Sequence, residues 1–134
     1  MNRIPDELYS DILQNVPIVC IDLVIKNSDN QFLVVKRNTE PAMNQWWLPG
    51  GRLMKGETFE KAARRKAMEE TGLRCRVLRQ ITTANTIFTT GPYGIPVHSV
   101  NICYLMQAPA TPKIVLDEYS SDHSWCADVD RKWH

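Results

Sequence analysis

The sequence predicts an α/β (α+β) fold in which helices cover a mixed β-sheet, and three observations support this class. A stretch with helical spacing opens the chain, two β-branched apolar runs follow, and a second helical stretch precedes further strand-like runs. This order is typical of a mixed sheet with helices packed on it. The chain has 134 residues and contains no linker, repeat or low-complexity tract. Residues 1–134 are therefore expected to form a single domain.

The first elements follow from local patterns. Residues 5–15 begin with Pro5 and two acidic residues and place apolar side chains on one side, which predicts a short amphipathic helix. The run IVCIDLVIKN from Ile18, the turn NSDNQ and the run FLVVKR predict a β-hairpin from Ile18 to Arg37. Asp22 interrupts the first apolar run and is expected to have a polar partner. A loop, NTEPAMNQWWLPGGR, then leads to the second helix.

The second helix has clear signals at both ends. Thr58 is a suitable N-cap, alanines favour the helical interior, and Gly72 is a suitable stop. Strands are predicted for CRVLRQITTA, NTIFTT and VHSVNICYLMQA, with a GPYGIP turn before the last of them. The closing residues DVDRKWH resemble the approach to a further helix that is cut short, which would expose sheet surface and favour a homodimer.

Composition excludes several classes of protein. The formal net charge is +1, so no overall field attracts nucleic acid or an anionic membrane. No apolar run approaches the roughly 18 residues of a membrane span, and the start MNRIPDELYSD does not resemble a signal peptide. The four cysteines are far apart and mostly lie in strand-like runs. We interpret them as buried free thiols of a cytoplasmic protein.

The stretch from Gly51 to Leu73 carries candidate chemistry. Charged residues at helical spacing most often form a solvated face with weak ion pairs. Against that interpretation, a loop rich in glycine enters the helix, Glu57 lies on this loop, and Glu69 and Glu70 are adjacent. Neighbouring carboxylates repel each other unless a cation neutralises them. A cluster of oxygen ligands suits Mg²⁺, with Mn²⁺ as an alternative, and Mg²⁺ commonly binds substrate phosphates as well.

This stretch resembles the Nudix box, Gly-x5-Glu-x7-Arg-Glu-U-x-Glu-Glu-x-Gly-U, in which U is aliphatic. The residues that match in register are Gly51, Glu57, Arg65, Glu69, Glu70, Gly72 and Leu73. Two positions depart from the motif, because Lys66 replaces a glutamate and Ala67 is a small residue for U. The resemblance implies the Nudix fold, a mixed β-sheet sandwiched between α-helices, and a Mg²⁺-dependent hydrolase whose substrate is a nucleoside diphosphate linked to another group.

The preceding segment KRNTEPAMNQWWLPGGR resembles one branch, the GDP-mannose mannosyl hydrolases. The matches to that branch are Arg37, Pro41, Ala42, Trp46, Pro49, Gly50, Gly51 and Arg52, together with Asp22. The resemblance implies that Arg37 and Arg52 contact the diphosphate, that Asp22 helps to bind the nucleotide sugar, and that the Gly50 carbonyl and Glu70 bind Mg²⁺. We expect Trp46 to lie near the ligand.

Other positions depart from this branch. Ser120, Ser99 and Tyr119 stand where the branch has a catalytic His, a Tyr and a metal-binding Gln. Glu69, which the branch has lost, is retained here, so the expected metal ligands are Gly50, Glu69 and Glu70. Glu118 is the best spare carboxylate for a base, and an ordinary exposed glutamate is the equal alternative. His123 is a second candidate base, although a half-buried strand histidine is the commoner outcome.

The expected function is hydrolysis of a nucleotide sugar such as GDP-mannose. The expected catalytic residues are Arg37, Arg52, Arg65, Glu69 and Glu118, and Arg65 would act by orienting Glu57 or Glu69. Lys66 would either neutralise diphosphate charge or form an ion pair with Glu70. Two alternatives remain open: a Nudix pyrophosphatase that attacks phosphorus, and a non-catalytic nucleotide-binding module.

Overall fold

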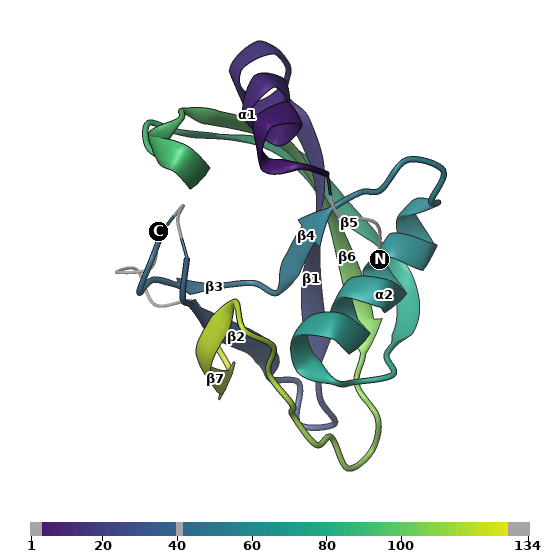
Figure 1. The fold of residues 1–134 in the computed structure, drawn as a ribbon. Coiled ribbons are helices and arrows are strands. Elements are labelled where there is room, and N and C mark those ends of the chain that lie inside the picture. Colours follow the sequence, from purple (N-terminus) through teal and green to yellow (C-terminus); the bar gives the residue numbers. More distant parts are fainter. Residues whose placement is uncertain (1–3, 40–41, 129–134) are drawn as a thin grey trace.

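The structure of the protein is a computed structural model that describes residues 4–39 and 42–128. Within these ranges a 7-stranded mixed sheet is accompanied by two α-helices (Figure 1). The elements are α1 (Asp6–Asn15), β1 (Ile18–Lys26), β2 (Phe32–Arg37), β3 (Trp46–Trp47), β4 (Gly50–Arg52), α2 (Phe59–Thr71), β5 (Arg76–Phe88), the 3₁₀-helix η1 (Pro92–Gly94), β6 (Val97–Gln107) and β7 (Ser120–Cys126).

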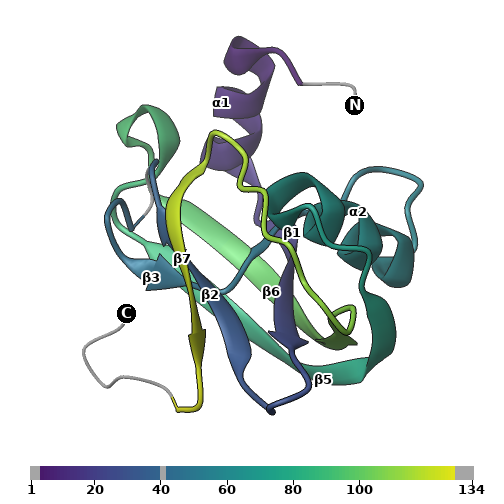
Figure 2. The same cartoon turned by 90° about the horizontal axis from the view of Figure 1, so that it is seen from below.

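The strand order is β3-β2-β1-β6-β5, with β4 added on β1 and β7 added on β2. β1 and β6 are parallel, with Ile18 opposite Ser99 and Lys26 opposite Gln107, whereas the other strand pairs are antiparallel. This combination confirms the predicted mixed sheet. α2 packs against β1, β4 and β5, and α1 lies beyond one end of the sheet (Figures 1 and 2).

Both helices begin and end where the sequence predicts. In α2 the Thr58 side chain accepts a hydrogen bond from the Lys61 N–H at 3.2 Å. Gly72 adopts a left-handed conformation with φ of 72°, and its N–H bonds to the Met68 carbonyl, which is the geometry that favours glycine after a helix. α1 begins after Pro5 and ends at Asn15, and the extended backbone of Val16 suits the residue before Pro17.

The alternation of β1 separates the core from the candidate site. Ile21, Leu23 and Ile25 are fully buried against the alanines of α2, which are also fully buried. Small residues allow the helix to approach the sheet closely, which explains the alanine at position 67. Because successive side chains of a strand point to opposite faces, Cys20 and Asp22 lie on the other face of β1. This face forms part of a cavity.

The predicted hairpin forms but separates after its first rung. Lys26 pairs with Phe32, and farther along β2 pairs instead with β3 and β7 while β1 pairs with β4. The predicted loop NTEPAMNQWWLPGGR therefore contains two short strands, β3 and β4. These strands bridge the space that opens between β1 and β2 (Figure 1).

Three other predictions need correction or lie outside the described residues. The two strands predicted after α2 form one continuous strand, β5, with irregular pairing to β6 near its start. The segment after β6, for which no strand is predicted, contains β7, because its residues complete the edge of β2. The predicted terminal helix falls almost entirely on residues 129–134, which are not described. Among the helices in the described ranges, none combines the length and apolarity that a membrane crossing requires.

Candidate functional site

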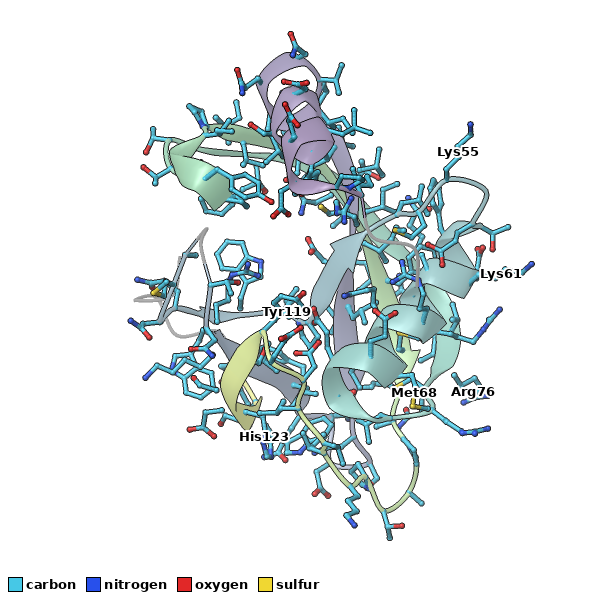
Figure 3. All side chains as sticks on the ribbon, viewed as in Figure 1. Lys55, Lys61, Met68, Arg76, Tyr119 and His123 are labelled. Atoms are coloured by element: carbon cyan, nitrogen blue, oxygen red, sulfur yellow. The ribbon has the colours of Figure 1, made fainter. Side chains whose placement is uncertain are left out.

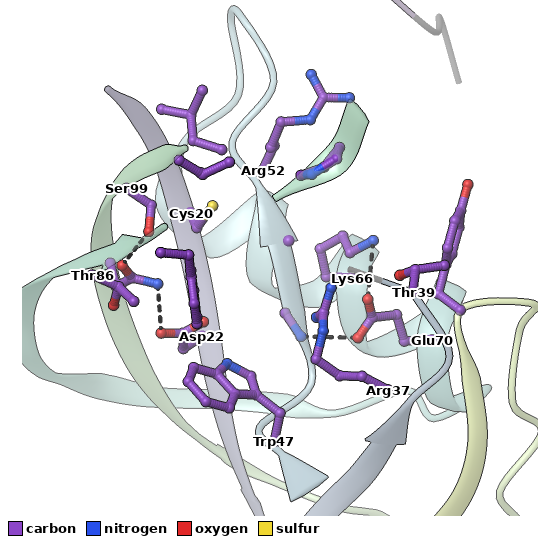
Figure 4. Close-up of a pocket in the computed structure, with 18 of the residues that line it drawn as sticks. Cys20, Asp22, Arg37, Thr39, Trp47, Arg52, Lys66, Glu70, Thr86 and Ser99 are labelled. Atoms are coloured by element: carbon purple, nitrogen blue, oxygen red, sulfur yellow. Dashed lines mark hydrogen bonds and ion pairs between the residues drawn. The ribbon is translucent and has the colours of Figure 1, made fainter. Parts of the chain in front are cut away.

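A cavity of about 710 Å³ lies where β1 and β2 separate (Figure 4). Its volume lies within the range of about 300–1,000 Å³ that is typical of small-molecule sites. Its walls come from α1, β1 to β4, α2, the 3₁₀-helix and the facing strands β5 and β6. Most of the residues predicted for the site reach this cavity: Asp22, Arg37, Gly50, Arg52, Arg65 and Glu70.

Arg65 organises the carboxylates at one side of the cavity. Its guanidinium donates to both oxygens of Glu57 at 2.7 and 2.8 Å, to Glu69 Oε2 at 3.1 Å and to the Arg52 carbonyl at 3.0 Å. The hydrogen bond from Arg65 lowers the pKa of Glu57 below its ordinary value. Arg65 therefore contacts both of the carboxylates between which its predicted orienting role was left open, and it ties the loop before α2 to the helix.

Lys66 lies between the two adjacent glutamates of α2. Its Nζ is 3.4 Å from Glu69 Oε2 and 3.4 Å from Glu70 Oε1, and the second of these pairs is drawn in Figure 4. Glu70 Oε2 also accepts a hydrogen bond from the Gly50 N–H at 2.9 Å. The pKa of Glu70 is raised, chiefly by burial, although Lys66 and the hydrogen bond from the Gly50 N–H act in the opposite direction. Lys66 and Glu70 are both buried, whereas the charged residues of a solvated helix face are exposed.

Asp22 has the polar partner that its position in β1 requires. Asn101 Nδ2 donates to Asp22 Oδ2 at 3.0 Å, and Ser99 Oγ donates to Asn101 Oδ1 at 2.8 Å. The parallel register of β1 and β6 brings these three cavity-lining residues together. Burial raises the pKa of Asp22, and the hydrogen bond from Asn101 and the charge of Arg37 oppose this rise.

Three cations converge on the cavity. Burial raises the pKa of the Cys20 thiol to about 11, with a further rise from Asp22, while the charges of Arg52, Arg37 and Lys66 all act in the opposite direction. Arg37, Arg52 and Lys66 all line the cavity, as Figure 4 shows. An anionic ligand there would meet three positive charges.

Aromatic rings form two other parts of the wall. Trp47 on β3 contacts Phe88 on β5, with ring centroids 5.8 Å apart. Tyr9 on α1 lies edge-on to Tyr93 at 6.5 Å, and the Arg52 Cζ lies 4.3 Å from the centroid of the Tyr9 ring. Tyr93 Oη donates to Asp6 Oδ1 at 2.7 Å and so joins η1 to α1.

Some predicted residues are placed away from the cavity. Trp46 does not line it, because adjacent residues of β3 point to opposite faces and Trp47 takes the inner position. Glu118 is exposed and does not line the cavity, although the neighbouring Tyr119 does. His123 is an exposed residue of β7, paired with Val35 and farther from the cavity than Tyr119 (Figure 3).

The predicted Mg²⁺ ligands Gly50, Glu69 and Glu70 come from β4 and α2, which meet at the Gly50–Glu70 hydrogen bond. Lys66 Nζ occupies the position between Glu69 and Glu70, and Gly50 meets Glu70 through its N–H. No group of three or more His, Cys, Asp and Glu side chains among residues 4–39 and 42–128 is arranged to hold a metal ion. The residues in this arrangement therefore do not fit a divalent cation, because an ammonium group already takes its place.

Sequence patterns missed several cavity residues. Asn101, Tyr9 and Thr86 reach the cavity through strand pairing and helix docking, and no local motif marks them. Trp47 was one of two adjacent tryptophans, and alternation alone cannot tell which one faces inward. Asp117 acts electrostatically on Glu70 and raises its pKa. No local motif distinguishes it from its neighbour Glu118.

Comparison with known proteins gives consistent matches. The NUDIX domain family matches residues 16–130. The Low-salt glycan biosynthesis protein Agl8 of Haloferax volcanii is 38% identical over 88 residues, which cover 66% of this chain and 56% of that protein. The ADP-ribose pyrophosphatase of Methanocaldococcus jannaschii is 44% identical over 57 residues, which cover 42% of this chain and 33% of that protein. The chain thus matches only part of the length of these relatives.

Solved structures share the fold. The MutT NUDIX hydrolase from Burkholderia pseudomallei has a TM-score of 0.72 and 26% identity, covering 88% of this chain and 90% of that chain. The NUDIX domain of Shewanella oneidensis NrtR, solved in complex with ADP ribose, has a TM-score of 0.66 and 22% identity, covering 92% and 83% of the two chains.

Proposed function

The chain belongs to the Nudix family of hydrolases, and from that membership we propose that it hydrolyses a nucleoside diphosphate linked to another group, with a nucleotide sugar such as GDP-mannose as the leading substrate class. The observation that carries this proposal is the convergence of Arg37, Arg52 and Lys66 on one cavity that also has aromatic walls. The cations suit a diphosphate, and the aromatic rings suit a base or a sugar.

The residues of the cavity suggest a division of roles. Arg37 and Arg52 would bind the diphosphate oxygens, and Asp22, held by Asn101, would accept a hydrogen bond from a sugar hydroxyl or a base. Arg65 would act as a positioning residue through Glu57 and Glu69. Glu69 and Glu118 remain the proposed catalytic carboxylates, and a role for the exposed Glu118 would require its loop to move.

The likeness to a low-salt glycan biosynthesis protein supports a sugar-containing substrate. The sequence similarity of residues 36–52 to the GDP-mannose mannosyl hydrolases supports the same class. In that reaction water attacks the anomeric carbon, the bond from carbon to phosphate oxygen breaks, and a nucleoside diphosphate and a free sugar are released. Cytoplasmic location and a homodimeric state remain predictions of this proposal. Use of Mg²⁺ also remains a prediction, and it would require Lys66 to move away from Glu69 and Glu70 when the substrate binds.

A second candidate is attack of water on phosphorus, which breaks a bond between phosphorus and the bridging oxygen and yields a nucleoside monophosphate. The retained Glu69 and the similarity to an ADP-ribose pyrophosphatase favour this alternative. A third possibility, binding without turnover, is motivated by the lysine that pairs with both carboxylates.

Hydrolysis in ¹⁸O-labelled water distinguishes the candidates. We expect GDP-mannose to be turned over and the label to appear in the released sugar, as detected by mass spectrometry. Label in a phosphate group would instead establish attack on phosphorus. The Glu70→Gln variant is expected to lose at least about 100-fold in turnover, since it removes a charge at the centre of the site. If the wild-type protein turns over none of a panel that includes GDP-mannose and ADP-ribose, the binding module is the correct description.

A further inference from the structure

We propose that the Lys66 ammonium is the resident cation of the Glu69–Glu70 pair and that it keeps divalent cations out of this site in the free protein. The inference rests on the proposed function only in taking this cavity as the active site. It concerns metal affinity before any nucleotide binds, so it can be tested without measuring hydrolysis.

The ion pairs supply the first argument. Lys66 Nζ lies 3.4 Å from one oxygen of each glutamate, so it bridges two adjacent carboxylates that otherwise repel each other. Lys66 and Glu70 are only 9% and 8% exposed. A buried side chain keeps its charge when an opposite charge pairs with it. The two ion pairs therefore favour the ammonium between Glu69 and Glu70 over an ammonium that extends into solvent.

The packing of the lysine stem supplies an independent argument. A Cβ atom placed on Gly51 would lie 2.5 Å from Lys66 Cε and 2.9 Å from Lys66 Nζ, closer than a real Cβ approaches another atom. The end of the lysine therefore rests directly on the Gly51 backbone, in space that any larger residue would fill. Lys61, on the same helix, is exposed and projects away from the molecule (Figure 3).

The charges around the site leave little attraction for a second cation. Three carboxylates, Glu57, Glu69 and Glu70, are paired with Arg65 or Lys66, and Glu69 is shared between both cations. The Lys66 ammonium already contacts one oxygen of Glu69 and one oxygen of Glu70. A divalent ion that entered between these glutamates would bind the same oxygens and would therefore lie close to the ammonium. The repulsion between like charges at this range opposes binding until Lys66 is withdrawn.

The experiment measures Mn²⁺ binding by electron paramagnetic resonance, in the absence of nucleotide, to the wild-type protein and to Lys66→Gln and Lys61→Gln. Removal of the competing charge is expected to increase the Mn²⁺ affinity of Lys66→Gln by about tenfold or more, given the strength of charge interactions at this range. Lys61→Gln makes the same change in net charge at an exposed position and is expected to stay within about twofold of the wild type, because screened surface charges act weakly.

Two further variants locate the effect and guard against misfolding. Lys66→Met keeps the apolar stem on Gly51 and is expected to show the same gain, while far-UV circular dichroism verifies the fold. Adding Glu70→Gln to Lys66→Gln should remove the gained binding. The proposal is overturned if both Lys66 variants bind Mn²⁺ no more tightly than the wild type. Micromolar binding of Mn²⁺ by the nucleotide-free wild-type protein also overturns it, whatever the variants do.

The results also separate this inference from the proposed function. A gain in Mn²⁺ affinity without hydrolysis of any nucleoside diphosphate derivative would support the role of Lys66 and remove the proposed activity. Hydrolysis by the wild type without any gain in Mn²⁺ affinity in the Lys66 variants would support the proposed activity and overturn the role of Lys66.

Discussion

At the scale of single residues, Arg65 connects the groups on which the candidate site depends. It contacts Glu57, Glu69 and the Arg52 carbonyl, so it joins the loop before α2, the helix itself and β4. The hydrogen bond to Glu57 is the largest contribution to the raised pKa of Arg65. Because the guanidinium is planar and rigid, each further hydrogen bond that Arg65 makes to a carboxylate costs little additional side-chain entropy.

Replacement of Glu57 by Gln is expected to destabilise the fold by about 1 kcal/mol at pH 7, because it removes a charged hydrogen-bond partner of Arg65. Since the folded pKa of Glu57 is lowered, its contribution is fully present above the unfolded pKa of about 4.3. The contribution is lost as the pH falls through the folded value. Urea denaturation of both proteins at pH 7 and at pH 3 should show the difference shrinking at the lower pH.

The matched control for this change is Glu7→Gln, which removes an exposed glutamate from α1. It is expected to change stability by no more than a few tenths of a kcal/mol. A deficit in Glu57→Gln that is equally large at pH 3 and pH 7 would mean that the loss comes from packing and that the charged pair contributes little.

At the scale of elements, the short strands β3 and β4 determine what faces the cavity. β3 is only two residues long and pairs with β2 through Trp47 opposite Val35 and Trp46 opposite Lys36. One tryptophan therefore faces the cavity, where it contacts Phe88, and its neighbour faces away. β4 brings Gly50 and Gly51 next to Glu70 and Lys66 of α2.

The two adjacent tryptophans allow a direct comparison of a side chain that lines the cavity with one that does not. Trp47→Ala is expected to weaken nucleotide-sugar binding by about tenfold, a loss typical of one aromatic stacking contact. Trp46→Ala is expected to change binding by less than about twofold, because its side chain does not line the cavity. Isothermal titration calorimetry with GDP-mannose measures both. A larger loss in Trp46→Ala would support the sequence-based choice of Trp46 and contradict the structural assignment.

At the scale of the whole molecule, residues far apart in sequence close the cavity. Asp6 of α1 and Tyr93 of η1 are 87 positions apart and are joined by a hydrogen bond of 2.7 Å. The Tyr9 ring stacks edge-on to Tyr93 and lies against Arg52. These contacts hold α1 over one end of the cavity, whereas the core that α2 forms with β1 lies on the other face of the sheet.

Tyr93→Phe is expected to weaken the attachment of α1 to η1, since it removes the hydroxyl that donates to Asp6 and keeps the ring. Amide hydrogen exchange in α1 should accelerate by about threefold to tenfold, in line with a net hydrogen-bond contribution of about 1 kcal/mol. Tyr104→Phe serves as the control, because it removes a different hydroxyl contact, to Glu60 of α2. Equal exchange of α1 in wild type and Tyr93→Phe would show that this contact does not hold the helix.

Much of the fold could be predicted because its signals are local. The caps of α2, the end of α1 before Pro17 and the alternation of β1 each depend on residues within a few positions of one another. The same holds for part of the site: the spacing of Arg65, Lys66, Glu69 and Glu70 on one helix predicts that they meet. Strand ends and the short strands in the loop could not be predicted, because they form only when a partner strand is present.

The sequence by itself determined the family, the two helices, the principal strands and the charged face of α2, since these follow from spacing along the chain. Only the tertiary structure decided that β1 and β2 separate to form the cavity, and that Asp22 meets Asn101 across the parallel β1–β6 pair. It also decided that Trp47 faces inward and that Lys66 rests on Gly51 between two glutamates. The physical reason is that strand pairing and close backbone approach depend on contacts between distant segments, which local periodicity does not encode.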